Sequence, residues 1–350
     1  MDDRNAQVGW TEAQWNRVRE EVLRAWMSVR VAGSFLPVYG ALPRSTQVVP
    51  SEIFDADGTV DERSVSPLVE ISLPVTLSRQ QVLEEDLSGA LLQFRRRATQ
   101  VAQLEDWYVF NGTYPGGLAT TGPWAAGPGG AGNQAERYLP SSPFLDRLIG
   151  KWHILKGMPQ PLADHDTMIR GMLLRDPGTL GLIYGAREVR HAAGSPRVID
   201  WPESGRLDNA GLMGVVVKAM NRLDENGYVG PYACVFGRLP FQAAHEPVGA
   251  SVTYPRDRIE PLIGRELLHA SALDVVPCPL RGFESPDKQK WQSRGVLLSL
   301  TGSAVDLAIA AEAAPEFRQV DVEGRYVFSV FERFTLRIKD PKAIVPLTFG

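Results

Sequence analysis

The chain has 350 residues, of which 22% are charged and 44% hydrophobic, proportions typical of a globular protein with one large or two ordinary domains. Its formal net charge of −4 favours neither nucleic acid nor a membrane as a partner, and no apolar run approaches the roughly 20 residues that span a bilayer. Two cysteines, Cys234 and Cys278, are too few for a disulfide framework, and no signal sequence is evident, so we expect a cytoplasmic protein.

The first predicted element is a helix from Thr11 to about Arg30. Thr11 and Gln14 have the spacing of a capping box, and tryptophans occupy the two hydrophobic-staple positions around it. Apolar residues then recur every three or four positions and predict one buried face: Trp15, Val18, Val22, Trp26 and Val29. Residues 31–39 are predicted to continue as an extended arm, because Gly33 and Pro37 oppose further helix.

Residues 48–66 contain proline, glycine and several acidic residues, which predicts a loop. Apolar residues alternate with others over 69–77 and predict a strand with one buried face, and Pro74 places this strand at a sheet edge or beside a bulge. A long helix is predicted at about 84–110, and its length of roughly 40 Å suits a structural spine. Its predicted apolar face comprises Leu87, Leu91, Phe94, Ala98, Val101, Leu104 and Tyr108.

The rest of the chain predicts a mixed region followed by a β-rich end. Residues 113–134 are rich in glycine, proline and alanine and are expected to be irregular, and a short helix is expected from Ser142. Further on, we expect strands at 182–190, 232–236, 296–300, 305–309, 326–338 and 343–349, a helix at 209–226 and a polar loop at 278–294. The last strands are expected to pair with the strand at 69–77, and the whole order of elements predicts an α+β fold.

The sequence motifs predict no catalytic, metal or cofactor site. Residues 127–132 match G-x-G-x-x-G, but the surrounding coil lacks the strand and helix that a dinucleotide site needs, so a loop is favoured. The Asp164–Asp166 region, with His165 between its two acids, has groups for a metal or for acid–base chemistry, although a solvated loop explains it more simply. The basic run 95–97 follows an acidic run on the same helix, which favours a solvated or interface face over nucleic-acid binding.

Six segments in chain order resemble the encapsulins, the shell proteins of bacterial and archaeal nanocompartments. They are the helix and arm from Thr11 to Val38, the acidic end of the long helix at Glu105 and Asp106, the G-x-x-G-P-Y stretch at 227–232, the segment from Tyr254 to Leu268, residues 295–299 and residues 332–343. The chain therefore resembles a family 1-type, or linocin-like, shell protein. Residues 113–178 have no counterpart in this resemblance and are interpreted as an insertion of unknown role.

This resemblance implies an HK97-type phage capsid-like fold. Such a fold has an N-terminal helix, a peripheral domain around a long spine helix, an extended E-loop that reaches a neighbouring subunit, and an axial domain. The implied division is 1–47 for the N-terminal helix and arm within the peripheral domain, 48–66 for the E-loop, 67–112 for the peripheral domain with its spine helix, 113–178 for the insertion, 179–295 for the axial domain and 296–350 for the C-terminal strands of the peripheral domain.

The resemblance further implies a structural shell subunit rather than an enzyme. Such subunits assemble into a closed icosahedral particle, here expected to be a T=1 shell of about sixty copies. The shell would enclose a cargo protein held by its C-terminal targeting peptide. Two classes of cargo are implied: a ferritin-like iron oxidase, which would give a role in iron storage, and a dye-decolorising peroxidase, which would give a role in oxidative stress.

Two sets of residues carry roles implied by the resemblance. The luminal docking surface for the cargo peptide is expected to comprise Trp15, Val18, Val22, Val31, Phe35, Val38 and Phe317. The five-fold pore region is expected to comprise Glu260, Ile263, Gly264, Arg265 and Glu266. No cofactor is expected, because Gln80 stands where flavin-binding relatives carry a tryptophan.

Two alternative interpretations stay open. A prophage or phage major capsid protein shares the implied fold but packages DNA into larger particles. A soluble enzyme using the Asp164–Asp166 region would instead form monomers or small oligomers and would lose activity when His165 is replaced. Particle size and particle content distinguish these alternatives from a nanocompartment shell.

Overall fold

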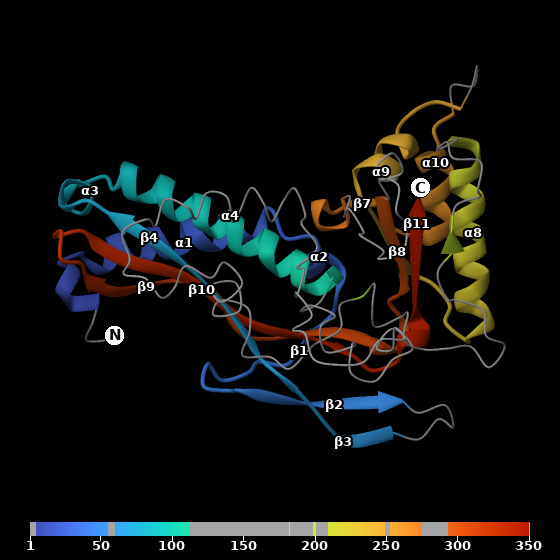
Figure 1. Ribbon diagram of the computed structural model, residues 1–350, viewed down its shortest axis with the longest axis horizontal. Coiled ribbons are helices and arrows are strands. Elements are labelled where there is room, and N and C mark those ends of the chain that lie inside the picture. Colours follow the sequence, from blue (N-terminus) through green and yellow to red (C-terminus); the bar gives the residue numbers. More distant parts are fainter. Residues whose placement is uncertain are drawn as a thin grey trace, which may run out of the picture.

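The computed structural model describes residues 5–54, 60–111, 182, 199–200, 209–248, 253–274 and 293–349. These residues form an elongated body with a more compact unit at one end (Figure 1). Several expectations fall outside the described residues. They are the expectations for 113–178, including the motifs at 127–132 and 164–166, for Cys278 and for most of the polar loop at 278–294. Of the strand expected at 182–190, the structure describes only Leu182, which is helical.

A four-stranded sheet, ordered β1-β9-β10-β4, forms one layer of the elongated body. Its strands are β1 (Val38–Tyr39), β9 (Val305–Val320), β10 (Tyr326–Ile338) and β4 (Val69–Leu77). β10 runs antiparallel to both β9 and β4, whereas β1 runs parallel to β9. β4 therefore lies at a sheet edge, as Pro74 predicted, and its expected pairing with a late strand is confirmed.

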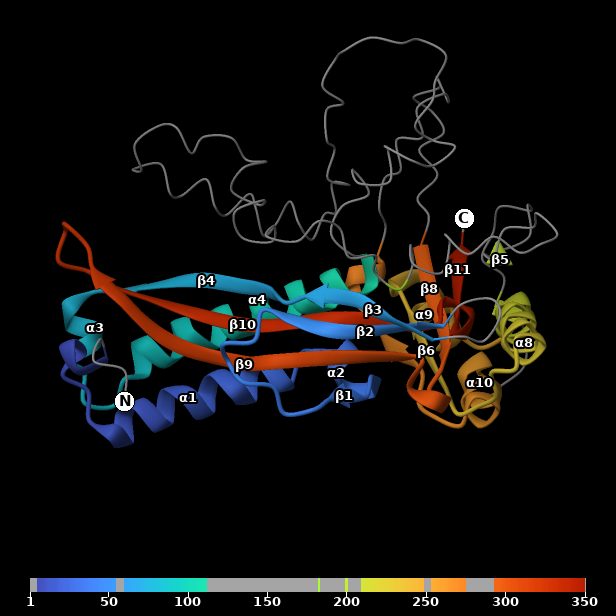
Figure 2. The same ribbon diagram turned by 90° about the horizontal axis from the view of Figure 1, so that it is seen from below.

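Helices cover one face of this sheet, as Figures 1 and 2 show from two directions. The two long ones are α1 (Glu12–Met27) and the spine helix α4 (Ser88–Asn111), and the short ones are η1 (Asn5–Val8), α2 (Ala32–Phe35) and α3 (Arg79–Leu83). The buried positions of β4 alternate along the strand, which is why its sequence alternates: Val69, Ile71, Leu73, Val75 and Leu77. Together with the apolar faces of α1 and α4 they form one continuous core.

The start of α1 follows the prediction closely. Thr11 is the N-cap, and its hydroxyl and the Gln14 side chain form the predicted capping box. The helix ends at Met27, three residues earlier than expected. The following arm is not fully extended, because Ala32–Phe35 forms a helical turn, α2. The prediction of an extended arm over 31–39 is wrong at this point.

The segment predicted as a loop at 48–66 is an antiparallel hairpin. Its strands β2 (Val48–Phe54) and β3 (Val60–Pro67) form a separate two-stranded sheet. In Figure 1 this β2–β3 hairpin projects below the long sheet, on the side opposite the helices. Proline and acidic residues are compatible with such a hairpin because only one of its faces is covered.

The compact unit contains a five-stranded sheet ordered β5-β11-β8-β6-β7. The strands are β5 (Ile199–Asp200), β11 (Ile344–Phe349), β8 (Ser293–Ser299), β6 (Tyr232–Phe236) and β7 (Leu268–His269). The helices beside it are α8 (Asn209–Glu225), α9 (Arg238–Ala244) and α10 (Pro255–Ile263), with short turns η4 (Ser271–Leu273), η6 (Thr301–Ser303) and η7 (Pro341–Ala343). Cys234 is fully buried on β6, so its interpretation as a small core residue is confirmed.

One part of the implied domain division differs from the structure. Residues 296–350 were expected to complete the peripheral domain, but β8 pairs with β11 and β6 in the five-stranded sheet, and β11 pairs with β8 and β5. Only β9 and β10 join the long sheet. The chain therefore crosses from the compact unit to the elongated body after β8 and returns for β11, and this tethers the two parts at two points.

Candidate assembly and cargo-docking surfaces

An aromatic cluster fastens α1 to the spine helix and the long sheet. Trp10 stacks on Phe328 of β10 with ring centroids 5.1 Å apart and meets Trp15 edge-on at 4.9 Å. Phe94 of α4 and Phe317 of β9 approach the same Phe328 ring at 5.4 and 5.3 Å. Offset and edge-on aromatic pairs stabilise beyond the burial of their area. This cluster therefore belongs to the core of the elongated body.

The structure buries most of the residues expected to dock a cargo peptide. Five of the seven are at most 6% exposed: Trp15, Val18, Val22, Phe35 and Phe317. For these five the expectation of an open apolar surface is wrong, because their side chains already pack within the core of the chain. Val31 is half-buried and Val38 is 55% exposed, so these two retain surface for a partner.

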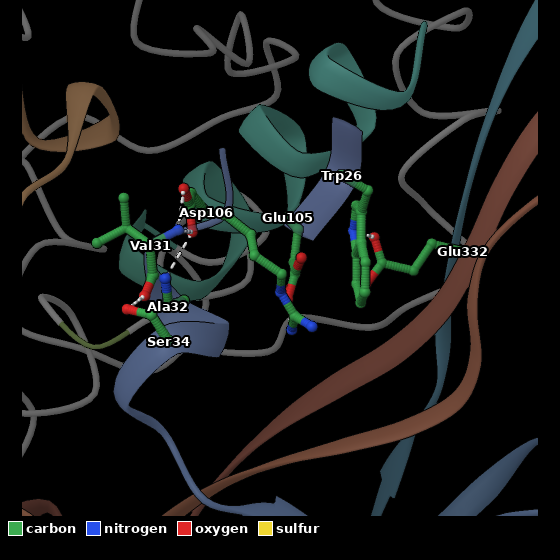
Figure 3. A network of polar contacts seen from close by, with 8 residues as sticks. Trp26, Val31, Ala32, Ser34, Glu105, Asp106 and Glu332 are labelled. Carbon is green, nitrogen blue, oxygen red and sulfur yellow. Dashed lines mark hydrogen bonds and ion pairs between the residues drawn. The ribbon is translucent and has the colours of Figure 1, made fainter. Parts of the chain in front are cut away.

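A buried polar network joins the arm after α1 to the end of the spine helix (Figure 3). The Asp106 carboxylate accepts the backbone N–H of Val31 at 2.9 Å and that of Ala32 at 2.8 Å. It thereby satisfies amides at the start of α2 that have no partner within the helical turn. The Ser34 hydroxyl closes the turn by donating to the Val31 carbonyl at 2.6 Å.

The same network continues to β10. The Arg30 guanidinium pairs with Glu105, and its central carbon lies 3.9 Å from the centroid of the Trp26 ring. The Trp26 indole donates to Glu332 at 3.0 Å, as Figure 3 shows. Glu105 and Glu332 are both fully buried, and each has one carboxyl oxygen with no hydrogen-bond partner among the described residues. Three acidic side chains thus share one nearby guanidinium.

Burial controls the protonation of these acids. It raises the pKa of Glu105 to about 7, against the lowering effect of the Arg30 charge. Burial also raises the pKa of Asp106 to about 7, although the two amides that it accepts lower it. The pKa of Glu332 is raised well above its ordinary value, first by burial and then by the Glu105 charge. The folded chain therefore holds protons here that the unfolded chain releases.

The β2–β3 hairpin has two unlike faces. Val49 and Ser51 are buried against the body, and the Ser51 and Ser66 hydroxyls hydrogen-bond across the strands. The other face is exposed and apolar and comprises Val48, Pro50 and Val65. Pro50 and Val65 are paired directly across the hairpin, so their side chains lie side by side. An apolar face on a projecting arm is suited to contact with another molecule.

The turn after α10 carries the residues expected near a pore. Gly264 ends the helix with a φ of +73°, a conformation that glycine adopts without steric cost, and its N–H donates to the Glu260 carbonyl at 2.9 Å. The Glu260 carboxylate accepts the Leu267 N–H at 3.3 Å and so holds the turn closed. Ile263 is buried and cannot line an opening, which corrects the expectation for that residue. Two charged side chains remain exposed at the turn: Arg265 and Glu266.

Sequence reasoning did not identify the polar network as a site, although one signal was present. Glu332 occupies an inward-facing position of a strand whose other inward residues are apolar, such as Val330 and Phe334. A carboxyl group at such a position needs a buried partner. The partners are Trp26 and the Arg30–Glu105 pair, which only the tertiary fold brings together.

Within the described ranges, no cluster of histidine, cysteine, aspartate or glutamate is arranged to hold a metal ion. Among the helices of those same ranges, none combines the length and the apolar character that spanning a bilayer requires. Gln80 lies exposed on α3.

Residues 201–276 match the model of a protein family described as an encapsulating protein for peroxidase. No curated protein matches the chain. Among solved structures, a virus-like particle from Pyrococcus furiosus is similar with a TM-score of 0.53 at 10% identity, over 96% of this chain and 100% of that chain. A holo-SrpI encapsulin complex from Synechococcus elongatus is similar with a TM-score of 0.48 at 9% identity, over 92% and 86% of the two chains. The capsid of an empty GTA particle is similar with a TM-score of 0.49 at 10% identity, over 92% and 90%.

The family match and the similarity to the virus-like particle confirm two expectations. The chain has an α+β, HK97-type capsid fold. The resemblance to encapsulins, first indicated by short motifs, is supported independently over the segment that contains α8, α9 and α10.

Proposed function

We propose that the chain is the shell subunit of an encapsulin-type nanocompartment, a closed icosahedral particle that encloses a cargo protein. One observation carries the proposal: a chain with the capsid fold along its length also matches, at 201–276, a family described by its encapsulating role. The proposal includes a cytoplasmic location, the absence of enzymatic activity in the shell itself and a T=1 arrangement of about sixty copies.

Assembly would use the exposed apolar face of the β2–β3 hairpin. Val48 and Val65 are 53% and 59% exposed, and a projecting hairpin with such a face is costly for a lone subunit to leave in water. Stable interfaces bury roughly 1,600 Å² in total, and each subunit of a closed shell makes several. Contact between the hairpin and a neighbouring subunit would therefore stabilise both.

Cargo would dock on the surface around Val31 and Val38. Val38 lies on β1, which covers only a short part of the β9 edge through its pairing with Leu307 and Ala308. A targeting peptide at the C-terminus of the cargo would bury apolar area against Val38, and an oligomeric cargo would gain further retention from several weak contacts at once. The proposed cargo is a ferritin-like iron oxidase or a dye-decolorising peroxidase, of which the peroxidase fits the description of the matching family.

A pore would be bordered by the exposed charges of Arg265 and Glu266. Because Ile263 and the Glu260 carboxylate are used inside the turn, these two side chains are the ones free to meet solutes. Opposite charges placed next to each other give a rim with little net preference for anions or cations. Selectivity would then depend mainly on the width of the opening.

The test is to purify particles from cells that make the chain at native levels, image them by electron microscopy and analyse their content. The proposal predicts uniform closed shells with one dominant co-purifying protein and an absorbance spectrum of protein. Large particles filled with DNA would instead assign the chain to the phage capsids. A small oligomer whose activity depends on His165 would assign it to soluble enzymes.

A further inference from the structure

A buried guanidinium lies where the hairpin, the N-terminal arm and the long sheet meet. Arg337 of β10 is 2% exposed, and its Nε and Nη2 each donate to the Asp306 carboxylate of β9 at 2.6 Å. Two parallel hydrogen bonds of this kind fix the plane of the guanidinium as well as its position. The remaining nitrogen, Nη1, donates to the Pro50 carbonyl of β2 at 2.7 Å.

The flat face of the same group is also occupied. The ring centroid of Tyr39 lies 3.5 Å from the Arg337 central carbon, which is a close cation–π contact. Tyr39 is half of β1, and β1 pairs with β9 beside Asp306. One side chain thus contacts β1, β2 and β9 at once. We call this set, Arg337 with Asp306, Tyr39 and Pro50, the Arg337 junction.

Charge balance explains why the junction reaches out to the hairpin. Lys339 places its ammonium 3.0 Å from the Asp306 carboxylate, so two cations share one buried acid. Glu52 on the hairpin lies 4.0 Å from the Lys339 ammonium and supplies a second negative charge. The Arg337 donor that Asp306 does not use is satisfied by the Pro50 carbonyl. Detaching the hairpin would therefore leave a buried donor without a partner and two cations facing one carboxylate.

The hairpin needs such an attachment because two-stranded sheets are marginal by themselves. Its outer face, with Val48 and Val65, is exposed, and among the hairpin side chains that the structure describes the buried ones are Val49 and Ser51. Of these two buried side chains, only Val49 is apolar. The Arg337 junction supplies a directional contact with the hairpin, from a strand that is itself paired on both sides.

We propose that Arg337 is the positioning residue that fixes the direction of the β2–β3 hairpin, and that this direction selects one regular particle size. The second half of this inference rests on the proposed shell function, whereas the first half concerns the subunit alone. A loosened hairpin would meet its neighbour at variable angles. Variable contacts give mixed or open assemblies instead of one closed shell, because closure requires the same rotation at every interface.

The direct test measures hydrogen–deuterium exchange of the backbone amides in 48–54 and 60–67. In Arg337→Lys the ammonium can still pair with Asp306, but it cannot bridge Asp306, Tyr39 and Pro50 together. We expect hairpin exchange to accelerate about ten-fold or more, with β9 and β10 changed much less. Hairpin exchange within about two-fold of the unmodified chain would overturn the proposal.

The matched control is Arg325→Lys. Arg325 pairs with Asp321 at 2.7 Å in the turn between β9 and β10, which Figure 1 shows at the far end of the body from the hairpin. If the effect is specific to the Arg337 junction, the rate of hairpin exchange in Arg325→Lys equals that of the unmodified chain. Should Arg337→Lys fail to fold, Tyr39→Leu replaces it, because it opens one face of the guanidinium and leaves its hydrogen bonds in place. Faster hairpin exchange in Tyr39→Leu supports the proposal, and unchanged exchange rejects it.

Particle sizes of the same variants separate this inference from the proposed function. Uniform particles from the unmodified chain and mixed sizes from Arg337→Lys support both. Uniform particles of equal size from both proteins reject the size-selecting role of Arg337 and leave the shell function standing. If the unmodified chain forms no particles, the shell function fails, and the exchange data still decide whether Arg337 holds the hairpin.

Discussion

At the scale of single residues, the buried acids of the polar network shape how stability depends on pH. Glu105 and Asp106 have a folded-state pKa of about 7, and that of Glu332 is also raised, so all three lie above their unfolded values. Folding then takes up protons between about pH 4.5 and pH 7. The contribution of this network to stability is therefore fully present at low pH and is lost as the pH rises through the folded-state pKa values.

Replacing Glu332 by Gln is expected to remove part of this pH dependence. Glutamine can accept from the Trp26 indole, as Glu332 does, and can donate to Glu105 without taking up a proton. Relative to the unmodified chain, the variant should be equally stable near pH 4.5 and more stable by about 1–3 kcal/mol near pH 8. Thermal unfolding at a series of pH values measures the difference. A difference that does not grow with pH would contradict this view of the network.

The residues expected to dock the cargo peptide differ in exposure, so substitutions can distinguish exposed docking residues from core residues. Val38→Asp places a charge on an exposed side chain, so shells should form normally while cargo retention falls about ten-fold or more. Val322→Asp is the matched control, because Val322 is fully exposed in the turn between β9 and β10. Cargo per particle is measured by quantitative mass spectrometry. An equal amount of cargo per particle in both variants would rule out Val38 as a docking residue. Phe35→Asp is uninformative, because Phe35 is a core residue.

At the scale of elements, strands and helices with their own local signal were predicted well. The capping box placed the start of α1, and alternation of apolar residues placed β4 and β10, although β10 also buries Ser329, Thr335 and Arg337. α2 was missed because its first amides bond to Asp106, which is 75 positions from Val31 in the chain. The hairpin was missed because its proline and acidic residues favour a loop, and its contact with Arg337 through the Pro50 carbonyl is visible only in the fold.

Sheet membership and the candidate sites depend on longer-range packing. β8 and β11 resemble β9 and β10 in sequence, yet they pair with each other in the five-stranded sheet, which also contains β5 and β6. The family resemblance implied a docking role for Trp15 and Val22, whereas their apolar periodicity predicted a buried helix face, and the structure places both side chains in the core. A single sequence does not distinguish these two uses of an apolar stripe.

Two glycines of the compact unit should respond to alanine in opposite directions. A Cβ at Gly295 in β8 would lie 2.8 Å from the Phe236 ring and 3.2 Å from Phe349, so Gly295→Ala should destabilise by about 1–3 kcal/mol. Gly214 in α8 has open space around its Cβ position, so Gly214→Ala should stabilise by up to about 1 kcal/mol through helix propensity. Thermal unfolding of both variants checks the pair. Equal shifts would contradict the packing described for β8.

At the scale of the whole molecule, the architecture favours completion by neighbours. A long sheet carries helices on one face, a projecting hairpin on the other side and a compact unit at one end (Figure 1). The exposed apolar side chains lie on separate parts of this shape, such as Val48 on the hairpin and Val229 beside the compact sheet. Interfaces at several separate sites suit a closed assembly better than a simple pair.

The most direct test of this account is the mass of the purified chain in solution at micromolar concentration, measured by mass photometry and sedimentation velocity. Sixty copies of a 38.5 kDa chain predict a single species of roughly 2.3 MDa. A well-folded chain that stays at 38.5 kDa under these conditions, with its hairpin amides open to exchange, would contradict the central claim.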